Sequence, residues 1–103
     1  MSSTEEPRHL NNHHRDTLLQ IFQHPAGHGV EWQRVVSLLE ATGSIDRRPD
    51  GRYVVRVGNE TAVFDRPRGK DIDVQQAVDL RHMLSAAGYG ALVNELEGRG
   101  QEV

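Results

Sequence analysis

The chain of 103 residues is long enough for one domain and too short for two, and its lack of cysteine excludes disulfides and thiolate metal sites. Its formal net charge of −3 argues against a protein that coats nucleic acid through overall positive charge. No apolar run approaches the roughly 20 residues of a membrane span, and the polar first residues do not resemble a signal peptide, so we expect a cytoplasmic protein without a membrane partner.

The sequence pattern at the start of the chain predicts a disordered segment followed by a helix. Residues 1–10 are polar and without periodicity, and we expect them to be disordered. Over residues 14–23 the apolar residues Leu18 and Phe22 recur at helical spacing, and Asn12 is expected to cap this helix. The apolar run from Leu18 to Phe22 exceeds what a small domain must bury, which leaves a homodimer open.

A second helix is expected from Val30 or Glu31 up to Gly43. Trp32 lies on the apolar stripe of this helix, so we predict that it belongs to the core rather than to a ligand site. Gly43 is expected to end the helix by adopting a positive φ, which glycine tolerates.

The next segment changes from helical to strand patterning. Residues 44–48 predict a weak edge strand, 52–57 the clearest strand and 61–64 a returning strand. The turns between them are predicted at Pro49-Asp50-Gly51 and at the two-residue hairpin Gly58-Asn59.

Side chains alternate along the middle strand, which divides its residues between two faces. Tyr53 shares one face with Val55 and Val57, and we expect the helices to cover this face. Arg52 and Arg56 would then point outward. If the opposite face were the covered one, the ring of Tyr53 would be free to stack on a base.

A third helix is predicted to begin after Asp73, which forms a capping box with Gln76 three residues on. Gly88 is expected to close this helix. A last short helix is expected over residues 91–96, with a flexible tail over 98–103.

Together these elements predict an α+β fold in a single domain of residues 11–97. Three short antiparallel strands must bury one face, and the helices are the only cover that the chain offers. No internal repeat indicates a second domain.

Several motifs between Val35 and Tyr89 occur in a fixed order. They are Val35-Val36-Ser37-Leu38-Leu39 followed by Gly43, Arg48-Pro49-Asp50-Gly51-Arg52-Tyr53, Pro67-Arg68-Gly69-Lys70-Asp71-Ile72, Leu80-Arg81 to Leu84, and Ala87-Gly88-Tyr89. In this order and spacing they resemble the HicA-type toxin family. The resemblance implies an α-βββ-α fold like that of double-stranded-RNA-binding domains, here with an extra N-terminal helix, and a toxin–antitoxin context with an antitoxin-like protein partner.

The resemblance also locates the family's chemistry. HicA-type toxins are thought to cleave RNA with a histidine just after the glycine-serine that opens the second strand. Counted from Gly51, that position holds Tyr53, whose phenol is a poor general base at neutral pH. The chain therefore resembles a divergent relative without the catalytic histidine. His13, His14 and His24 are the candidates for a relocated base.

Basic residues follow the predicted hairpin. If the loop after the third strand folds beside the sheet, its cations and those of the middle strand could contact an RNA backbone. These candidates are Arg52, Arg56, Arg66, Arg68 and Lys70. The alternative is a solvated surface whose arginines pair with the neighbouring aspartates.

Three functions stay open at this point. The first is an RNA-binding module that has lost the toxin's catalysis, and the second is an active endoribonuclease (an mRNA interferase) with a relocated histidine. The third is a protein-interaction module or homodimer. No cofactor fingerprint is present, and the histidine spacing does not form a metal-binding motif.

Overall fold

The computed structural model describes residues 10–23 and 29–100. This part of the chain has the α+β class predicted from the sequence. Its elements, in chain order, are α1 (Asn12–Phe22), α2 (Trp32–Thr42), β1 (Ser44–Arg47), β2 (Arg52–Val57), β3 (Glu60–Asp65), α3 (Val74–Ala86) and α4 (Tyr89–Gly100).

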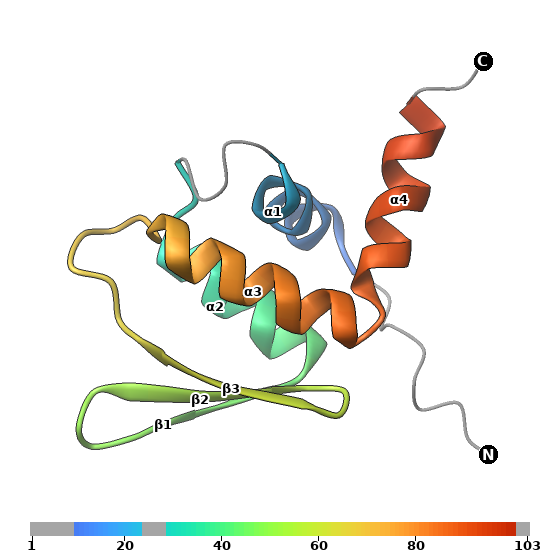
Figure 1. Ribbon diagram of the computed structural model, residues 1–103. Coiled ribbons are helices and arrows are strands. Elements are labelled where there is room, and N and C mark those ends of the chain that lie inside the picture. The colour runs from blue at the N-terminus through green and yellow to red at the C-terminus, as the bar shows by residue number, and fades with distance from the viewer. Residues whose placement is uncertain (1–9, 24–28, 101–103) are drawn as a thin grey trace.

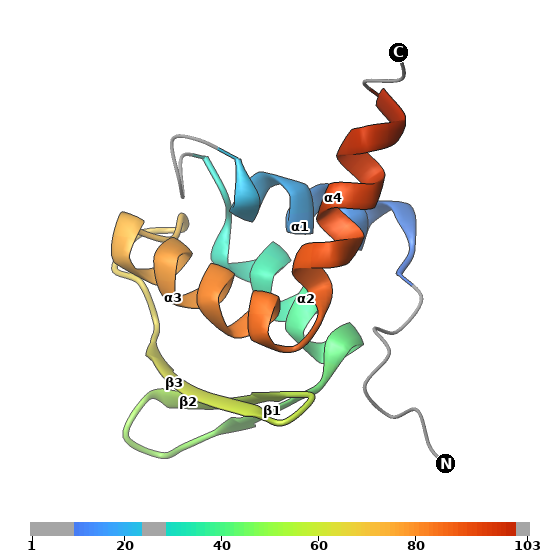
Figure 2. The ribbon, with the colours of Figure 1, turned by 45° about the vertical axis from the view of Figure 1, so that its right-hand side comes forward.

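The elements form three layers (Figure 1). The antiparallel sheet has the order β1-β2-β3. Against one of its faces lie α2, which contacts β1 and β2, and α3, which contacts β3. In both Figure 1 and Figure 2, α1 and α4 lie on the side of α2 and α3 that is away from the sheet. Within the described part of the chain, the second face of the sheet therefore has no helix over it.

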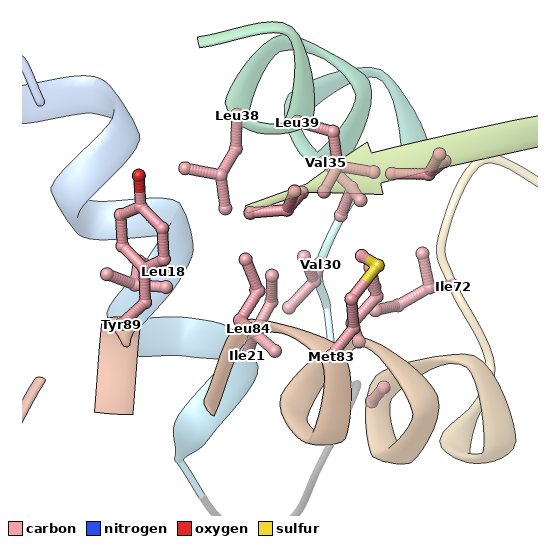
Figure 3. Packing of buried hydrophobic residues seen from close by; sticks show 14 of the residues in the cluster. Leu18, Ile21, Val30, Val35, Leu38, Leu39, Ile72, Met83, Leu84 and Tyr89 are labelled. Carbon is pink, nitrogen blue, oxygen red and sulfur yellow. The ribbon is translucent and has the colours of Figure 1, made fainter. Parts of the chain in front are cut away.

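The core lies between the helices and the covered face of the sheet. Figure 3 shows Leu38 of α2 and Leu84 of α3 pointing toward one another across this interior. Both residues are fully buried, as are Leu18 and Ile21 of α1. Leu19 and Phe22 pack, partly buried, against the same cluster. The apolar run 18–22 is thus largely accommodated within one chain, so it is no longer an argument for a homodimer.

The burial of the side chains along β2 confirms that its residues divide between two faces as predicted. Val55 and Val57 are fully buried and Tyr53 is half-buried on the covered face, whereas Arg52 and Arg56 are exposed on the other face. We refer to the side away from the helices as the open face.

The capping predictions have two outcomes. Asp73 and Gln76 form the predicted capping box at the start of α3: Gln76 N–H donates to Asp73 Oδ1 over 2.7 Å, and Asp73 N–H donates to Gln76 Oε1 over 3.0 Å. The prediction for α1 was wrong by one residue. Asn11, rather than Asn12, accepts a hydrogen bond from His14 N–H on its side-chain oxygen. Asn12 is already helical.

Gly43 has a different role from the one expected. Its φ is −166°, which is extended backbone, so a positive φ does not explain the glycine. A Cβ atom at this position would overlap the carbonyl oxygen of Arg56 on β2. Gly43 is therefore required because β1 begins where the backbone of β2 approaches it closely.

The ends of the domain also differ from expectation. Most of the segment expected to be disordered, residues 1–10, lies outside the described residues, but Leu10 is described and is 2% exposed in the core. The last helix begins at Tyr89 and continues to Gly100, so it is longer than the expected 91–96 and includes the start of the expected tail. Tyr89 and Val93 are buried and anchor α4 to the core.

Candidate nucleic-acid interface

The β1–β2 turn brings arginines from two strands together. Arg47 ends β1 and Arg52 begins β2, and the Arg48 N–H donates to the Arg52 carbonyl over 2.8 Å. Between them, Gly51 adopts a φ of 91°, and Asp50 Oδ1 accepts from Arg52 N–H over 3.0 Å. The tight turn therefore places Arg48 and Arg52 beside one another.

The loop after β3 returns to the same end of the sheet. Asp65, the last residue of β3, is the register partner of Arg52, so Arg66 follows directly beside the start of β2. Arg66 and Arg68 are exposed. In Figures 1 and 2 the β1–β2 turn and the β3–α3 loop lie on the same side of the molecule.

Lys70 is fixed at this end by the backbone. Its carbonyl accepts from Trp32 N–H over 2.7 Å, and Ile72 N–H donates to the Val30 carbonyl over 2.9 Å. The segment before α2 and the segment before α3 thus form a short bridge. We call the resulting set of cations the basic end: Arg47, Arg48, Arg52, Arg66, Arg68 and Lys70.

Arg56 does not belong to the basic end. It is on the open face of β2, opposite Ser44 and Thr61 and near the Gly58-Asn59 hairpin. It lies four positions along the strand from Arg52, which is about 13 Å because a strand rises about 3.3 Å per residue. The structure therefore brings together four of the five predicted cations and places the fifth at the opposite end of β2.

Carboxylates lie among these cations. Salt bridges join Arg48 to Asp46 over 3.4 Å and Arg52 to Asp65 over 3.7 Å. The side chains of both pairs are more than half exposed, and exposed pairs of this kind contribute only about 0–1 kcal/mol. Similar long pairs are Arg47–Glu40 at 3.7 Å and Lys70–Glu31 at 3.8 Å.

No salt bridge involves Arg66 or Arg68 within residues 10–23 and 29–100. These two guanidinium groups, and the weakly paired Arg48 and Arg52, can therefore turn to a phosphate at little cost. A guanidinium binds a phosphate through two parallel N–H donors, which suits this arrangement.

Tyr53 lies on the covered face. Its ring meets the Trp32 ring edge-on, with 5.3 Å between centroids and an interplanar angle of 86°. The Arg47 guanidinium carbon lies 5.6 Å from the centroid of the same ring. The residue at the family's histidine position is thus packed between α2 and β1 and does not offer its ring to a base on the open face. Trp32, 5% exposed, is a core residue as predicted.

The candidate histidines do not gather around Tyr53. His13 is exposed on α1, and His14 Nε2 lies 2.9 Å from Ser37 Oγ, where α1 packs on α2. His24 lies outside the described residues. His82 of α3 lines a groove beside β3 rather than β2. The described part of the chain places no histidine against the ring of Tyr53.

The described residues offer neither a metal site nor a membrane span. They contain no group of three or more His, Asp or Glu side chains that could hold a metal ion. None of their helices is both long enough and apolar enough to cross a membrane.

Comparisons with known proteins add no relative. No protein-family model matches the chain, and the chain matches no curated protein and no solved structure. The resemblance to HicA-type toxins therefore rests on the sequence motifs alone and stays a prediction.

Arg47 and Arg48 were missed as members of the site. The signal that could have found them is the Pro49-Asp50-Gly51 turn, because a tight turn between antiparallel strands places the residues on its two sides next to each other. Arg81, by contrast, belongs to the Leu80-Arg81 motif of the resemblance but is not a surface cation. Its Nε donates to the Ile21 carbonyl at the end of α1 over 3.2 Å.

Proposed function

We propose that the protein is an RNA-binding module, a divergent HicA-like relative that contacts the RNA backbone with its basic end and has lost the family's histidine-based cleavage. The observation that carries this proposal is the convergence of cations from β1, β2 and the β3–α3 loop at one end of the sheet. Arg66 and Arg68 have no salt bridge among the described residues, and the ion pairs of the others are long and exposed.

The arrangement suits recognition of shape and charge rather than of base sequence. Proteins recognise A-form RNA largely through contacts to phosphates and 2′-hydroxyl groups. Lysine and arginine side chains that contact phosphates release counterions from the RNA, which makes the affinity depend on salt. Asp46 and Asp65 reduce the local positive charge, so we expect weak binding with a strong dependence on salt. Tyr53 supplies no base stacking because its ring packs on Trp32.

The test is binding of the purified protein to a mixed cellular RNA pool over a series of salt concentrations. The double variants Arg48→Ala/Arg52→Ala and Arg66→Ala/Arg68→Ala each remove two cations of the basic end. Each is expected to make the negative slope of log K against log salt shallower by about 1.4–1.8, since one phosphate contact contributes about 0.7–0.9 to its magnitude. Absence of binding at low salt would refute the proposal.

Arg56→Ala is the matched control. It removes an exposed arginine from the same face of the same strand, outside the basic end, and we expect it to change the slope by less than half as much as either double variant. A change of about 0.7–0.9, which is half that of a double variant, would mean that the RNA also contacts Arg56 and follows the whole length of β2, as the sequence suggested.

The integrity of the RNA after incubation separates binding from catalysis. Intact RNA is the expected result, because the described residues place no histidine against Tyr53. Cleavage would favour the alternative of an active interferase, and the variants His13→Ala, His14→Ala and His24→Ala would then locate its base.

A further inference from the structure

Within residues 10–23 and 29–100, the outer edge of β3 has backbone groups without partners in the sheet. In an antiparallel pair, successive residues direct their N–H and C=O groups alternately toward the partner strand and away from it. On β2, the Arg52 carbonyl accepts from Arg48 N–H, and the Arg56 carbonyl faces Gly43, so both residues point toward β1. Their neighbours Tyr53 and Val55, together with Val57, therefore point toward β3.

The register transfers this pattern to β3. The residues opposite Tyr53, Val55 and Val57 are Phe64, Ala62 and Glu60, and these bond to β2. The intervening residues, Thr61, Val63 and Asp65, direct their groups outward. Gln76 Nε2 donates to the Asp65 carbonyl over 2.7 Å from α3, which agrees with this direction. The groups of Thr61 and Val63 and the N–H of Asp65 remain for an added strand.

A groove of about 630 Å³ runs beside this edge, between β3 and α3. Its lining is mixed, and its apolar part comes from both elements: Ala62 and Phe64 of β3, and Val78, Met83 and Ala86 of α3. Val63 is 57% exposed, and it and Val74 are the large hydrophobic residues most exposed in the described part of the chain. An edge strand beside an apolar groove is the geometry in which an extended peptide adds to a sheet.

The charges of the groove indicate the chemistry of its occupant. Its lining includes the carboxylates of Glu60 and Asp79 and, among the described residues, no lysine or arginine. A second copy that paired its β3 with this β3 would bring two further carboxylates and no lysine or arginine from that strand. Residues 1–9 carry Glu5 and Glu6 against the single cation Arg8, and they have almost no apolar side chains to alternate along a strand. Neither a second β3 nor residues 1–9 carries a net positive side-chain charge, so neither fits well beside the carboxylates of Glu60 and Asp79.

We propose that β3 and α3 bind an extended segment of a partner protein, which adds to the sheet as a fourth strand. The segment has apolar residues at alternate positions, to enter the groove, and a lysine or arginine to meet Glu60 and Asp79. This site is separate from the basic end and does not depend on RNA binding.

The probe is a blocked synthetic peptide of about eight residues, close to a typical strand length, in which valine alternates with lysine and threonine. A matched peptide has glutamate in place of lysine. Binding is measured by fluorescence anisotropy, and the site is located by amide hydrogen exchange. We expect the amides of Thr61, Val63 and Asp65 to become protected, while those of Ala62 and Phe64 are already slow in the free protein. The acidic peptide should bind at least about tenfold more weakly.

Two variants, each with a matched control, test how the peptide binds without changing the core. Val63→Pro removes one outward N–H, which an edge strand tolerates, and should abolish peptide binding. Val63→Thr keeps that N–H and should retain binding. Ala86→Arg, at an exposed groove position, should repel the basic peptide, whereas Ala91→Arg, at an exposed position of α4 that does not line the groove, should have no effect.

Three outcomes would overturn the proposal. One is equal binding of the two peptides, or binding of neither, by folded protein. Another is protection that does not alternate along β3. The third is protection of the same amides without peptide, accompanied by a doubled mass at high protein concentration, because a second copy would then occupy the edge.

Discussion

On β3, Phe64 is 3% exposed and its neighbour Val63 is 57% exposed, because successive side chains of a strand point to opposite faces of the sheet. The covered face is determined by burial: Val55, Val57 and Phe64 fill the space under α2 and α3. On the open face no such constraint acts within the described chain. The stability of the protein therefore depends on one face, and the candidate interfaces lie on the open face and at the ends and edge of the sheet.

The largest expected difference between the two faces is in the free energy of unfolding when Phe64 or Val63 is truncated to alanine. Phe64→Ala removes a buried aromatic ring and should lower the free energy of unfolding by about 3–5 kcal/mol. Val63→Ala should change it by less than about 0.5 kcal/mol, because the side chain is mostly in solvent. Urea denaturation of both variants measures this contrast, and similar losses for the two would show that something covers the open face in solution.

The junction between α2 and the sheet should show the next largest effect. Gly43→Ala places a Cβ atom against the Arg56 carbonyl and should lower the free energy of unfolding by about 1–3 kcal/mol through overpacking. Gly69→Ala is the control, since a Cβ atom at Gly69 meets nothing within 4 Å. Thermal unfolding of the pair tests the explanation, and a neutral Gly43→Ala variant would contradict it.

Gln76 connects the edge strand to α3 and gives a smaller effect. Its side chain accepts from Asp73 N–H and donates to the Asp65 carbonyl. Gln76→Glu keeps the acceptor and loses the donor, and we expect a loss of about 1 kcal/mol, against about 1–2 kcal/mol for Gln76→Ala. The matched control is Gln75→Ala, whose exposed bond to Asp79 should contribute little. Denaturant titration measures these losses, and a Gln76→Glu variant as stable as the unchanged protein would show that the bond to the Asp65 carbonyl contributes nothing.

The smallest effect on stability is expected on the open face at the basic end. Arg52→Ala and Asp65→Asn each remove one partner of the exposed pair and should change the free energy of unfolding by less than about 0.5 kcal/mol. Their effects on RNA should be opposite: Arg52→Ala weakens binding, whereas Asp65→Asn strengthens it by removing a negative charge near the phosphates. Filter binding at low salt measures both, and weaker binding by Asp65→Asn would argue against the proposed contacts.

The sequence was sufficient for features that depend on local patterns. Alternation placed Tyr53 on one face with Val55 and Val57 and favoured that face as the covered one, although the opposite choice stayed open. The Asp73–Gln76 spacing predicted the capping box. The length of α4 was underestimated because Tyr89 and Val93 are held by tertiary packing on the core rather than by helix propensity.

Other features depend on how distant segments meet, and no local pattern encodes them. The need for glycine at position 43 arises from the approach of β2, which lies thirteen residues later at Arg56. Likewise, the groove beside β3 depends on the distance at which α3 packs from the edge. Of the predicted cations, Arg52, Arg66, Arg68 and Lys70 do come together, because the register of β2 and β3 determines where the loop returns.

The position of Trp32 has an optical consequence. It is the single tryptophan of the chain, its backbone N–H donates to the Lys70 carbonyl, and its ring contacts the Tyr53 ring, over which the Arg47 guanidinium lies. The indole emission therefore arises next to two members of the basic end. A ligand that draws Arg47 or Lys70 toward itself should shift the emission spectrum of the unlabelled protein, whereas a peptide on the far side of β3 should leave it unchanged.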